Sequence, residues 1–224
     1  MVFVVKPLKF SGIALCTDPS SISMISFFMP AKAFSKYNVE KATTVGVNLE
    51  NLAKILSRTR DNESLVIKDV DNKLSLEFIA DKNRRRYKLQ MIEVKKSAEK
   101  EPTIAFDARV EIMGETLKDI IKDASLISSY ISFKATKDQF GVSAKGDTGE
   151  LEGLHDKDHE SIKKLEATKN AESVFNLEFL ENMVKSCPIG NSINIELKST
   201  EPLKVKYNIG EAEVTYFLAP YMEE

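Results

Sequence analysis

The stretch NLENL at residues 48–52 recurs as NLEFL at residues 176–180. In both copies a helix-like stretch follows, then a polar break, and then two stretches with the alternation of a strand. The corresponding parts are residues 60–64 and 188–192 for the break, 65–67 and 193–195 for the first strand, and 74–78 and 203–207 for the second. A shared order of elements at nearly the same spacing indicates an internal duplication. The sequence therefore predicts two similar domains.

Length and composition agree with two folded domains. The chain has 224 residues, of which 42% are hydrophobic and 29% are charged. Chains of this length commonly form two domains of about 110 residues each. The composition is that of an ordinary soluble globular protein, and it argues against disordered, collagen-like and low-complexity chains.

Residues 94–103 (VKKSAEKEPT) separate the two copies. The segment is charged, lacks bulky apolar side chains and has a proline near its end, which is typical of an exposed connector. We therefore expect an N-terminal domain at residues 1–93, a connector at residues 94–103 and a C-terminal domain at residues 104–224.

The sequence gives no sign of a membrane protein or of a secreted one. No apolar run approaches the roughly 18 residues of a membrane span. Residues 1–8 (MVFVVKPL) are too short an apolar stretch for a signal peptide and lack a cleavage site. Two cysteines, Cys16 and Cys187, are too few for a disulfide framework that stabilises a chain of this size. We therefore expect an intracellular protein. Without a histidine partner in the pattern, Cys16 is interpreted as a small buried thiol and not as a nucleophile.

Most of each half has the pattern of β-strands, and three segments have helical period. The helical segments are residues 49–59, 114–125 and 177–186, with Asn48 and Asn176 as expected N-caps. We expect an α+β fold in which antiparallel sheets have a few short helices on one side. The expected strands are residues 22–29, 65–69, 73–78 and 86–94 in the first half, and 104–112, 130–134, 140–145, 150–154, 193–197, 203–207 and 213–218 in the second.

The apolar faces of the helices are expected to pack on the sheets. In the first helix Leu49, Leu52 and Leu56 share a face, with Ile55 beside them. In the second helix the corresponding stripe consists of Leu117, Ile120, Ile121 and Ala124.

Basic residues recur on the opposite faces of these helices. Lys54 and Arg58 are like-charged neighbours at i, i+4, and Lys118 and Lys122 repeat the arrangement, which is mildly destabilising without a negative partner. Two interpretations stay open: solvated helix faces, or surfaces that face phosphate. The formal net charge is −2, whereas proteins that bind nucleic acid over a broad face are usually strongly basic. Any contact with DNA is therefore expected to be local and weak.

Two further clusters of polar residues are candidate binding sites. Residues 155–159 (HDKDH) place two histidines at i, i+4, but no third ligand cluster is evident, so a polar loop is favoured over a metal site. Residues 82–86 (KNRRR) are either a hairpin tip that touches phosphate or a polar turn. The sequence contains no Gly-rich phosphate loop, nucleophile elbow or zinc spacing.

Several motifs together resemble one family. They are Gly12-Ile13, Asp18-Pro19-Ser20, Gly46-Val47-Asn48-Leu49, residues 118–125 (KDIIKDAS) and residues 217–220 (FLAP). The combination resembles sliding clamps of the proliferating cell nuclear antigen (PCNA) type, more archaeal than eukaryotic. The resemblance implies two clamp domains with short helices on an inner face, and three subunits that close a ring around duplex DNA.

The N-terminus departs from the family pattern. In the family a strand, a helix and a second strand precede the Gly-Ile turn. In this sequence only residues 1–10 are available before that turn. We expect a strand at residues 2–5 and no room for the full first helix. Either the first domain lacks one of its DNA-facing helices, or the sequence omits a segment.

By this resemblance, residues are assigned to two of the family's surfaces. The DNA-lining residues are Lys54, Arg58, Arg60, Lys118, Lys122 and Lys185, with Arg84 and Arg85 as further candidates. Ring closure is expected to pair residues 86–94 of one subunit with residues 149–156 of the next, through Arg86, Lys88, Gln90, Glu150, Leu151 and Glu152. The basic strand and the acidic strand are complementary in charge, which favours one register.

The resemblance also implies a pocket for short client peptides. Its residues are Met24, Pro102, Ile104, Phe106, Pro202, Phe217, Leu218, Ala219, Pro220 and Tyr221. Without the resemblance, Met24 and Phe217 are interpreted as core residues. The implied partners are duplex DNA, related clamp subunits in a homotrimer or heterotrimer, a replicative DNA polymerase, a flap endonuclease, a DNA ligase and a clamp-loader ATPase.

The resemblance implies no catalytic residue, no cofactor, no metal and no membrane, and a place in the cytoplasm with the nucleoid, or in the nucleus if the protein is eukaryotic. Two rival hypotheses stay open. One is a metal-dependent hydrolase built around residues 155–159, and the other is a diverged clamp-like scaffold that binds peptides but is not loaded onto DNA.

Overall fold

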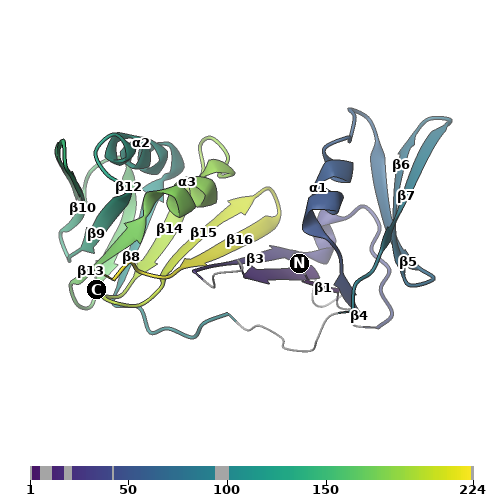
Figure 1. Cartoon of the computed structure of the whole chain (residues 1–224), viewed down its shortest axis with the longest axis horizontal. Helices are drawn as coiled ribbons and strands as arrows, with labels where there is room; N and C mark the ends of the chain where they lie inside the picture. The colour runs from purple at the N-terminus through teal and green to yellow at the C-terminus, as the bar shows by residue number, and fades with distance from the viewer. Residues whose placement is uncertain (1, 6–11, 18–21, 42, 94–100, 223–224) are drawn as a thin grey trace. The chain divides into compact units, whose positions relative to one another are not determined.

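The computed structural model describes residues 2–5, 12–17, 22–41, 43–93 and 101–222, with side chains from residue 22 onward (Figure 1). The chain divides into two compact units. Unit 1 comprises residues 1–16 and 30–99, and unit 2 comprises residues 17–29 and 100–224. The Asp18-Pro19-Ser20 motif and residues 94–100 of the expected connector lie outside the described residues. The sequence prediction gave residues 17–29 to the first domain, whereas the structure groups them with the second.

Unit 2 contains two antiparallel sheets. One has the strand order β12-β8-β14-β15-β16-β3, and the other has the order β11-β10-β9-β13. Residues 17–29 belong to this unit because β3 pairs with β16, with Met24 opposite Phe217. The strands of the first sheet are β12 (Ile162–Ala167), β8 (Ala108–Met113), β14 (Ser192–Leu197), β15 (Leu203–Ile209), β16 (Ala212–Leu218) and β3 (Ser23–Met29). Those of the second are β11 (Gly149–Asp156), β10 (Gln139–Gly146), β9 (Tyr130–Ala135) and β13 (Ala171–Asn176).

Two helices, α2 (Gly114–Ser125) and α3 (Leu177–Lys185), pack against each other in unit 2 (Figure 1). The predicted stripe of α2 is buried in the core, as are four residues of α3. The buried helix residues are Leu117, Ile120, Ile121 and Ala124 of α2, and Leu177, Leu180, Met183 and Val184 of α3. The prediction that this face of α2 packs on the core is confirmed.

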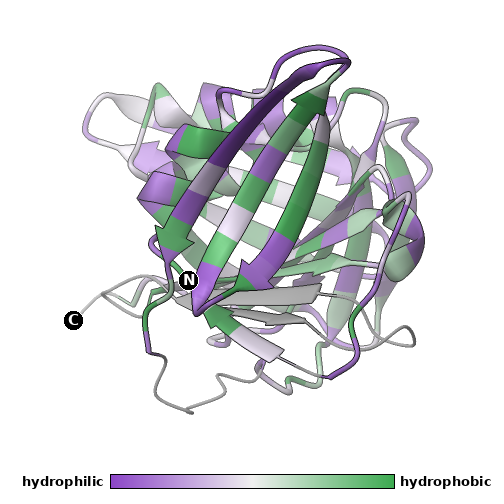
Figure 2. Cartoon of the chain, turned by 90° about the vertical axis from the view of Figure 1, so that its right-hand side faces the viewer, coloured by the Kyte–Doolittle hydropathy of each residue, from purple (hydrophilic) through white to green (hydrophobic). Residues whose placement is uncertain are grey.

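Unit 1 is smaller and contains one α-helix among its described residues, α1 (Leu49–Leu56), besides the short 3-10 helix η1 (Ala31–Ala33). Three strands pair in the order β2-β1-β4, and three in the order β5-β6-β7. The bounds are β1 (Val2–Val5), β2 (Gly12–Thr17), β4 (Thr43–Gly46), β5 (Ser64–Val70), β6 (Lys73–Ala80) and β7 (Asn83–Gln90). In Figure 2, hydrophilic and hydrophobic residues both occur along the strands β5, β6 and β7, and β7 begins with a hydrophilic run.

The core of unit 1 is built mainly from β4, α1 and β6. Its buried residues are Val45, Val47, Leu52, Leu74, Leu76 and Phe78. Of the helix residues expected to pack on the sheet, Leu52 is buried and Ile55 is partly buried against this cluster. Leu49 and Leu56 are 43% and 38% exposed, so that part of the prediction is wrong. These two side chains share the apolar face, but no described element covers them.

The local sequence patterns predicted most helices and strands within a few residues of their observed bounds. The asparagine caps are confirmed, because the Asn48 side chain accepts a 2.9 Å hydrogen bond from the Asn51 N–H, and the Asn176 side chain accepts one of 2.9 Å from the Glu178 N–H. The first helix ends at Leu56 and not at residue 59, with Ser57 in the C-cap position. Strands β2, β4, β12 and β13 were not among the expected strands. No helix of the described residues is long and apolar enough to cross a membrane.

Candidate functional site

The two predicted basic residues of α2 have different surroundings. The Lys118 ammonium donates a 2.6 Å hydrogen bond to the main-chain carbonyl of Cys187, just beyond α3. This hydrogen bond connects α2 with the residues that follow α3. The Lys118 side chain is partly buried. Lys122 is exposed, and its Nζ lies 3.2 Å from Asp119 one turn earlier on the same helix. Of this pair, Lys122 is exposed and Lys118 is only partly exposed.

The end of α3 adds one further exposed cation, Lys185. Acidic side chains share this helix layer, among them Glu178 and Glu181 on α3 and Asp119 on α2. The exposed charge of the layer is therefore mixed, with cations spaced along it and no dense basic patch. Such a surface attracts phosphate only weakly.

In unit 1 the predicted cations lie on α1 and beyond its end. Lys54 is exposed and makes an ion pair of 2.5 Å with Glu50, one turn earlier. Arg58 and Arg60 follow the helix and are exposed. Because α1 ends at Leu56, Lys54 and Arg58 are not two positions of one helix face, as the spacing suggested.

The basic cluster at residues 82–86 begins β7 and is engaged with carboxylates of unit 1. Arg84 Nε and Arg86 Nη2 lie 3.3 Å and 2.8 Å from the same oxygen of Glu77 on β6. The Glu77 carboxylate is 8% exposed. The hydrogen bond from Arg86, together with the nearby charges, holds the pKa of Glu77 below its ordinary value of 4.5.

Arg85 points to the other side of β7 and is more enclosed. Its Nη2 lies 2.5 Å from Glu63 and donates a 3.1 Å hydrogen bond to the Arg58 carbonyl, and the guanidinium carbon lies 5.0 Å from the centre of the Phe78 ring. Burial raises the pKa of Glu63, but hydrogen bonds from the Arg60 N–H and Arg85 outweigh it, so the net shift is downward. These contacts give Arg85 a structural role in unit 1, which argues against the predicted contact with DNA.

The two strands expected at the subunit interface are both edge strands of their sheets. Among the described residues, β7 pairs only with β6, and β11 pairs only with β10. On β7, Arg86, Lys88 and Gln90 are exposed. On β11, Glu150 and Glu152 are exposed, whereas Leu151 packs partly against the core. Each unit thus presents an open row of main-chain groups, one with basic and one with acidic side chains.

These charges are partly engaged within their own units. Arg86 is bound to Glu77, as described above. Lys145 on β10 lies 2.8 Å from Glu150 on β11, and this contact lowers the pKa of Glu150. Among the described residues, no ion pair involves Lys88 or Glu152.

The residues expected to form the peptide pocket all belong to unit 2. Met24, Ile104, Phe106, Pro202, Ala219 and Pro220 are partly exposed, and Pro102 and Tyr221 are exposed. Phe217 is buried, and Leu218 is a fully buried member of the core. Leu218 therefore cannot contact a bound peptide through its side chain, which corrects the sequence prediction. For Phe217 the interpretation as a core residue holds in this structure.

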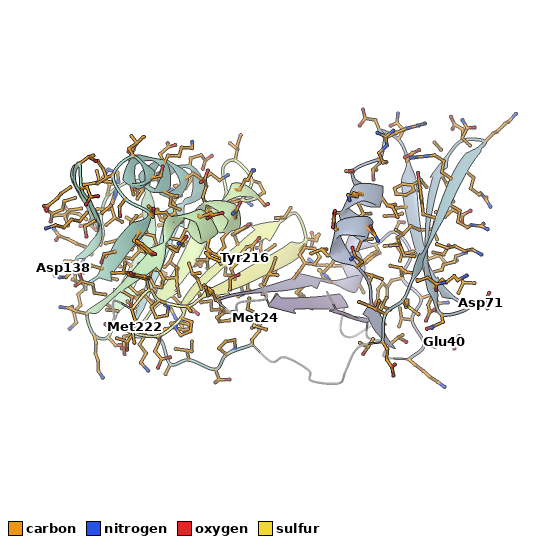
Figure 3. All side chains as sticks on the ribbon, viewed as in Figure 1. Met24, Glu40, Asp71, Asp138, Tyr216 and Met222 are labelled. Atoms are coloured by element: carbon orange, nitrogen blue, oxygen red, sulfur yellow. The ribbon has the colours of Figure 1, made fainter. Side chains whose placement is uncertain are left out.

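The C-terminal segment is fixed to unit 2 by main-chain contacts. The Ala219 N–H donates to the Ile22 carbonyl, and the Tyr221 N–H donates to the Val174 carbonyl, both at 2.8 Å. The Tyr221 ring lies 4.0 Å from the Tyr130 ring, centre to centre. Figure 3 shows Met24 and Met222 on this unit, together with Tyr216. The contact with Tyr130 was missed, because the two tyrosines are far apart in sequence.

The two histidines of residues 155–159 lie next to each other, the first within β11 and the second just after it. The His155 and His159 rings are edge to face at 5.7 Å, and His159 Nδ1 lies 2.8 Å from the Ser161 hydroxyl. Burial and the neighbouring His159 lower the pKa of His155. Among the described residues no group of three or more His, Cys, Asp or Glu side chains is placed to hold a metal ion.

Comparison with protein families assigns both halves of the chain. Residues 7–100 match the N-terminal domain of proliferating cell nuclear antigen, and residues 100–222 match the C-terminal domain of the same protein. The chain belongs to the PCNA family. The resemblance deduced from the sequence motifs is thereby confirmed, as is the fold of two clamp domains with mostly antiparallel sheets and a few short helices.

Archaeal relatives support this PCNA assignment. The chain is 34% identical over 209 residues to a DNA polymerase sliding clamp of Thermococcus gammatolerans, which covers 92% of this chain and 84% of the relative. It is 32% identical over 208 residues to the DNA polymerase sliding clamp of Pyrococcus furiosus, with the same coverage.

Solved PCNA structures have the same fold. The crystal structure of PCNA from Thermococcus kodakaraensis superposes with a TM-score of 0.89 at 25% identity, covering 98% of this chain and 89% of that one. A. fulgidus PCNA, solved with the C-terminal region of FEN-1 bound to it, superposes with a TM-score of 0.89 at 21% identity, covering 100% and 89%.

Proposed function

We propose that this PCNA-family protein is a ring-shaped sliding clamp that encircles duplex DNA and increases the processivity of a DNA polymerase. The observation that supports this most strongly is that both clamp domains are matched, in order, over nearly the whole chain. Relatives at about one third identity are DNA polymerase sliding clamps. We assign the chain no catalytic activity of its own, and we place it with the chromosome, in the cytoplasm if the source is archaeal.

In this proposal the ring holds DNA by topology and not by tight binding. A closed ring cannot leave the duplex sideways, so its lining needs only diffuse positive charge and no contacts with base edges. Widely spaced cations on surfaces of mixed charge suit this purpose, because they create no sequence-dependent traps. The cations assigned to the lining are Lys54, Arg58, Arg60, Lys122 and Lys185, which are exposed in the structure.

Ring closure would join β7 of one subunit to β11 of the next as antiparallel neighbours. Both edges are open among the described residues, and such edges usually need a partner or protection in a stable protein. Lys88 would lie near the acidic face of β11, where Glu152 is exposed. Either three copies of this chain or a mixture of related clamp subunits would complete the ring.

Client proteins would dock short peptides on unit 2, near Met24, residues 101–106 and the C-terminal segment. The complex of A. fulgidus PCNA with a FEN-1 C-terminal region is a precedent for a peptide on this fold. We assign a polymerase, a flap endonuclease and a DNA ligase as clients. A separate ATPase would open the ring, since the sequence has no phosphate-binding loop.

Loading onto nicked circular DNA tests this function. A sliding clamp loaded by an archaeal clamp-loader ATPase is expected to stay on the circle through gel filtration at high salt and to be lost after the circle is cut. A protein held by ordinary charge contacts is expected to leave both forms as salt rises. Equal loss from circular and linear DNA would contradict the proposal.

A second candidate is a peptide-binding clamp relative that is not loaded onto DNA. It is favoured by one observation: Lys118, Arg84 and Arg85, three of the predicted DNA contacts, are engaged within their own units. For this candidate we expect client peptides to bind while no protein remains on the circular DNA.

A further inference from the structure

The connection between β14 and β15 in unit 2 is longer than its counterpart in unit 1. Residues 198–202 join β14 to β15, whereas residues 71–72 alone join β5 to β6. The last residue of the longer connection is Pro202, which is assigned to the client-peptide pocket. The position of this connection, called here the 198–202 turn, therefore bears on the shape of the proposed pocket.

Two serine hydroxyl groups join the 198–202 turn to β13. The Ser173 hydroxyl accepts a 2.9 Å hydrogen bond from the Thr200 N–H and donates one of 3.5 Å to the Lys198 carbonyl. The Ser199 hydroxyl in turn accepts a 3.0 Å hydrogen bond from the Glu172 N–H. The turn is thus bound to two adjacent residues of the strand, by a side chain from each partner.

The Ser173 hydroxyl is a buried group whose partners lie in the turn. Ser173 is 7% exposed, and both groups that it binds belong to the 198–202 turn. Buried polar groups need hydrogen-bond partners, because water does not replace the ones they lose. Removing the hydroxyl would therefore release the turn from its place on β13.

Thr200 adopts a backbone conformation that its own side chain disfavours. Its φ is +64°, in the left-handed region that β-branched residues rarely enter. Such a conformation persists where the surrounding contacts enforce it, and the hydrogen bond from the Thr200 N–H to Ser173 is one of these contacts. We therefore expect the turn to change its conformation when this hydrogen bond is lost.

The next residue of β13 holds a second segment that is assigned to the pocket. The Val174 carbonyl accepts a 2.8 Å hydrogen bond from the Tyr221 N–H, which fixes residues 219–221 to this strand. The two segments also meet in the sheet, because Leu203, the first residue of β15, lies opposite Leu218. One short stretch of β13 thus holds both the turn and the C-terminal segment.

Unit 1 repeats the main-chain contact but not the serine contact. The Ile92 N–H, beyond β7, donates a 2.9 Å hydrogen bond to the Gly46 carbonyl. When the two copies are aligned on their N-cap asparagines, Gly46 corresponds to Val174 and Val45 corresponds to Ser173. Valine has no hydroxyl group. The serine contact is therefore particular to unit 2, which is the unit to which the pocket is assigned.

We propose that Ser173 is a positioning residue of the client-peptide pocket. Because it is buried, it acts through the 198–202 turn and holds Pro202 in the place where the peptide binds. A surface that is already ordered loses less conformational entropy on binding, so preorganisation raises affinity. This inference rests on the proposed docking of client peptides on unit 2.

Peptide affinity tests the positioning role. The probe is a synthetic peptide of the FEN-1 C-terminal region that is bound in the A. fulgidus PCNA structure, titrated calorimetrically into the full chain. Ser173→Ala is expected to weaken its binding by about fivefold to tenfold, because the turn is no longer held before binding. Ser173→Thr keeps the hydroxyl in a residue that suits a strand, and it is expected to bind within about twofold of the parent chain.

Two further variants separate this role from a general loss of stability. Ser161→Ala removes another buried hydroxyl of unit 2, which is 2.8 Å from His159, and is expected to leave peptide affinity unchanged. Ser199→Ala removes the reciprocal hydrogen bond at an exposed position, where folding is not at risk, and is expected to weaken binding about threefold.

Hydrogen exchange provides a readout that does not depend on the peptide. In Ser173→Ala the amides of residues 199–201 are expected to exchange about tenfold faster or more, while the amides of α2 and α3 keep their parent rates. In Ser161→Ala the amides of residues 199–201 are expected to keep their parent rates. A uniform increase over the whole of unit 2 in Ser173→Ala would indicate global destabilisation and would contradict the positioning role.

The results distinguish the failure of this inference from the failure of the proposed docking. If the parent chain does not bind the peptide, the proposed docking is wrong and the positioning role is wrong with it. If the parent chain binds the peptide and Ser173→Ala binds it equally well, docking stands and the role of Ser173 is wrong. Equal weakening in Ser173→Ala and Ser161→Ala would also overturn the inference.

Discussion

The Lys118 ammonium and the Cys187 carbonyl are joined by a hydrogen bond of 2.6 Å, which connects α2 with the turn that follows α3. Carbonyl groups at the end of a helix lack partners within the helix, and a cation is favourable there. The spacing of Lys118 and Lys122 suggested one common role for them. The structure separates them into a residue that joins two helices and a residue that faces solvent.

Replacing Lys118 is therefore expected to cost stability. Lys118→Met leaves the Cys187 carbonyl without its donor and is expected to lower the free energy of unfolding by about 1–2 kcal/mol. Lys122→Met, at an exposed position, is expected to change it by less than about 0.5 kcal/mol. Urea denaturation followed by circular dichroism measures both. Equal effects of the two substitutions would show that the hydrogen bond makes no net contribution to the free energy of unfolding.

Glu77 is expected to make unit 1 sensitive to acid. Because Arg86 and Arg84 bind its carboxylate, the pKa of Glu77 lies below its ordinary value of 4.5 in the folded chain. A carboxyl group with a lowered pKa stabilises the fold above its unfolded pKa, and this contribution is lost as the pH falls through the folded value. We therefore expect unit 1 to lose stability below about pH 4.5.

Glu77→Gln tests this pH dependence. The variant is expected to be less stable at neutral pH and to lose less further stability on acidification, as measured by hydrogen exchange of β6 amides between about pH 3 and 6. Glu160→Gln, at an exposed carboxylate, is the control and is expected to keep the parent profile. A parent-like profile in Glu77→Gln would argue against a role for this carboxylate.

The sequence predicted those features that depend on local pattern. The repeated asparagines identified two helix starts, since an N-cap needs only a side chain three residues or fewer from the N–H groups it binds. The ion pairs of the basic cluster at residues 82–86 could not be predicted from local pattern. Its carboxylate partners, Glu77 and Glu63, come from another strand and from the turn before β5, and nothing local specifies that pairing.

The exposure of Leu49 and Leu56 was also beyond the reach of the sequence. Helical period shows which residues share a face, but it does not show whether another element covers that face. Burial at the corresponding Leu177 and Val184 depends on α2, which precedes them by a long stretch of chain. The difference in burial becomes visible only when α1 of unit 1 is compared with α3 of unit 2.

A charge swap tests the proposed subunit interface. Lys88→Glu or Glu152→Lys alone places like charges across the proposed contact between β7 and β11, and each is expected to weaken subunit association about tenfold. The double variant restores opposite charges and is expected to recover association. Light scattering over a range of protein concentrations measures the mass. If the double variant associates no better than the single ones, these residues do not face each other.

The proposed lining predicts a defect in DNA retention without a defect in folding. Reversal of Lys54, Arg58 and Lys122 to glutamate removes exposed cations and adds negative charge toward phosphate, so we expect a loss of polymerase processivity and of clamp sliding on circular DNA. Reversal of Lys164, an exposed residue of β12, is the control and is expected to have no effect on processivity. Both variants are expected to keep the parent mass in light scattering. Unchanged processivity in the triple variant would exclude these cations from the DNA-facing surface.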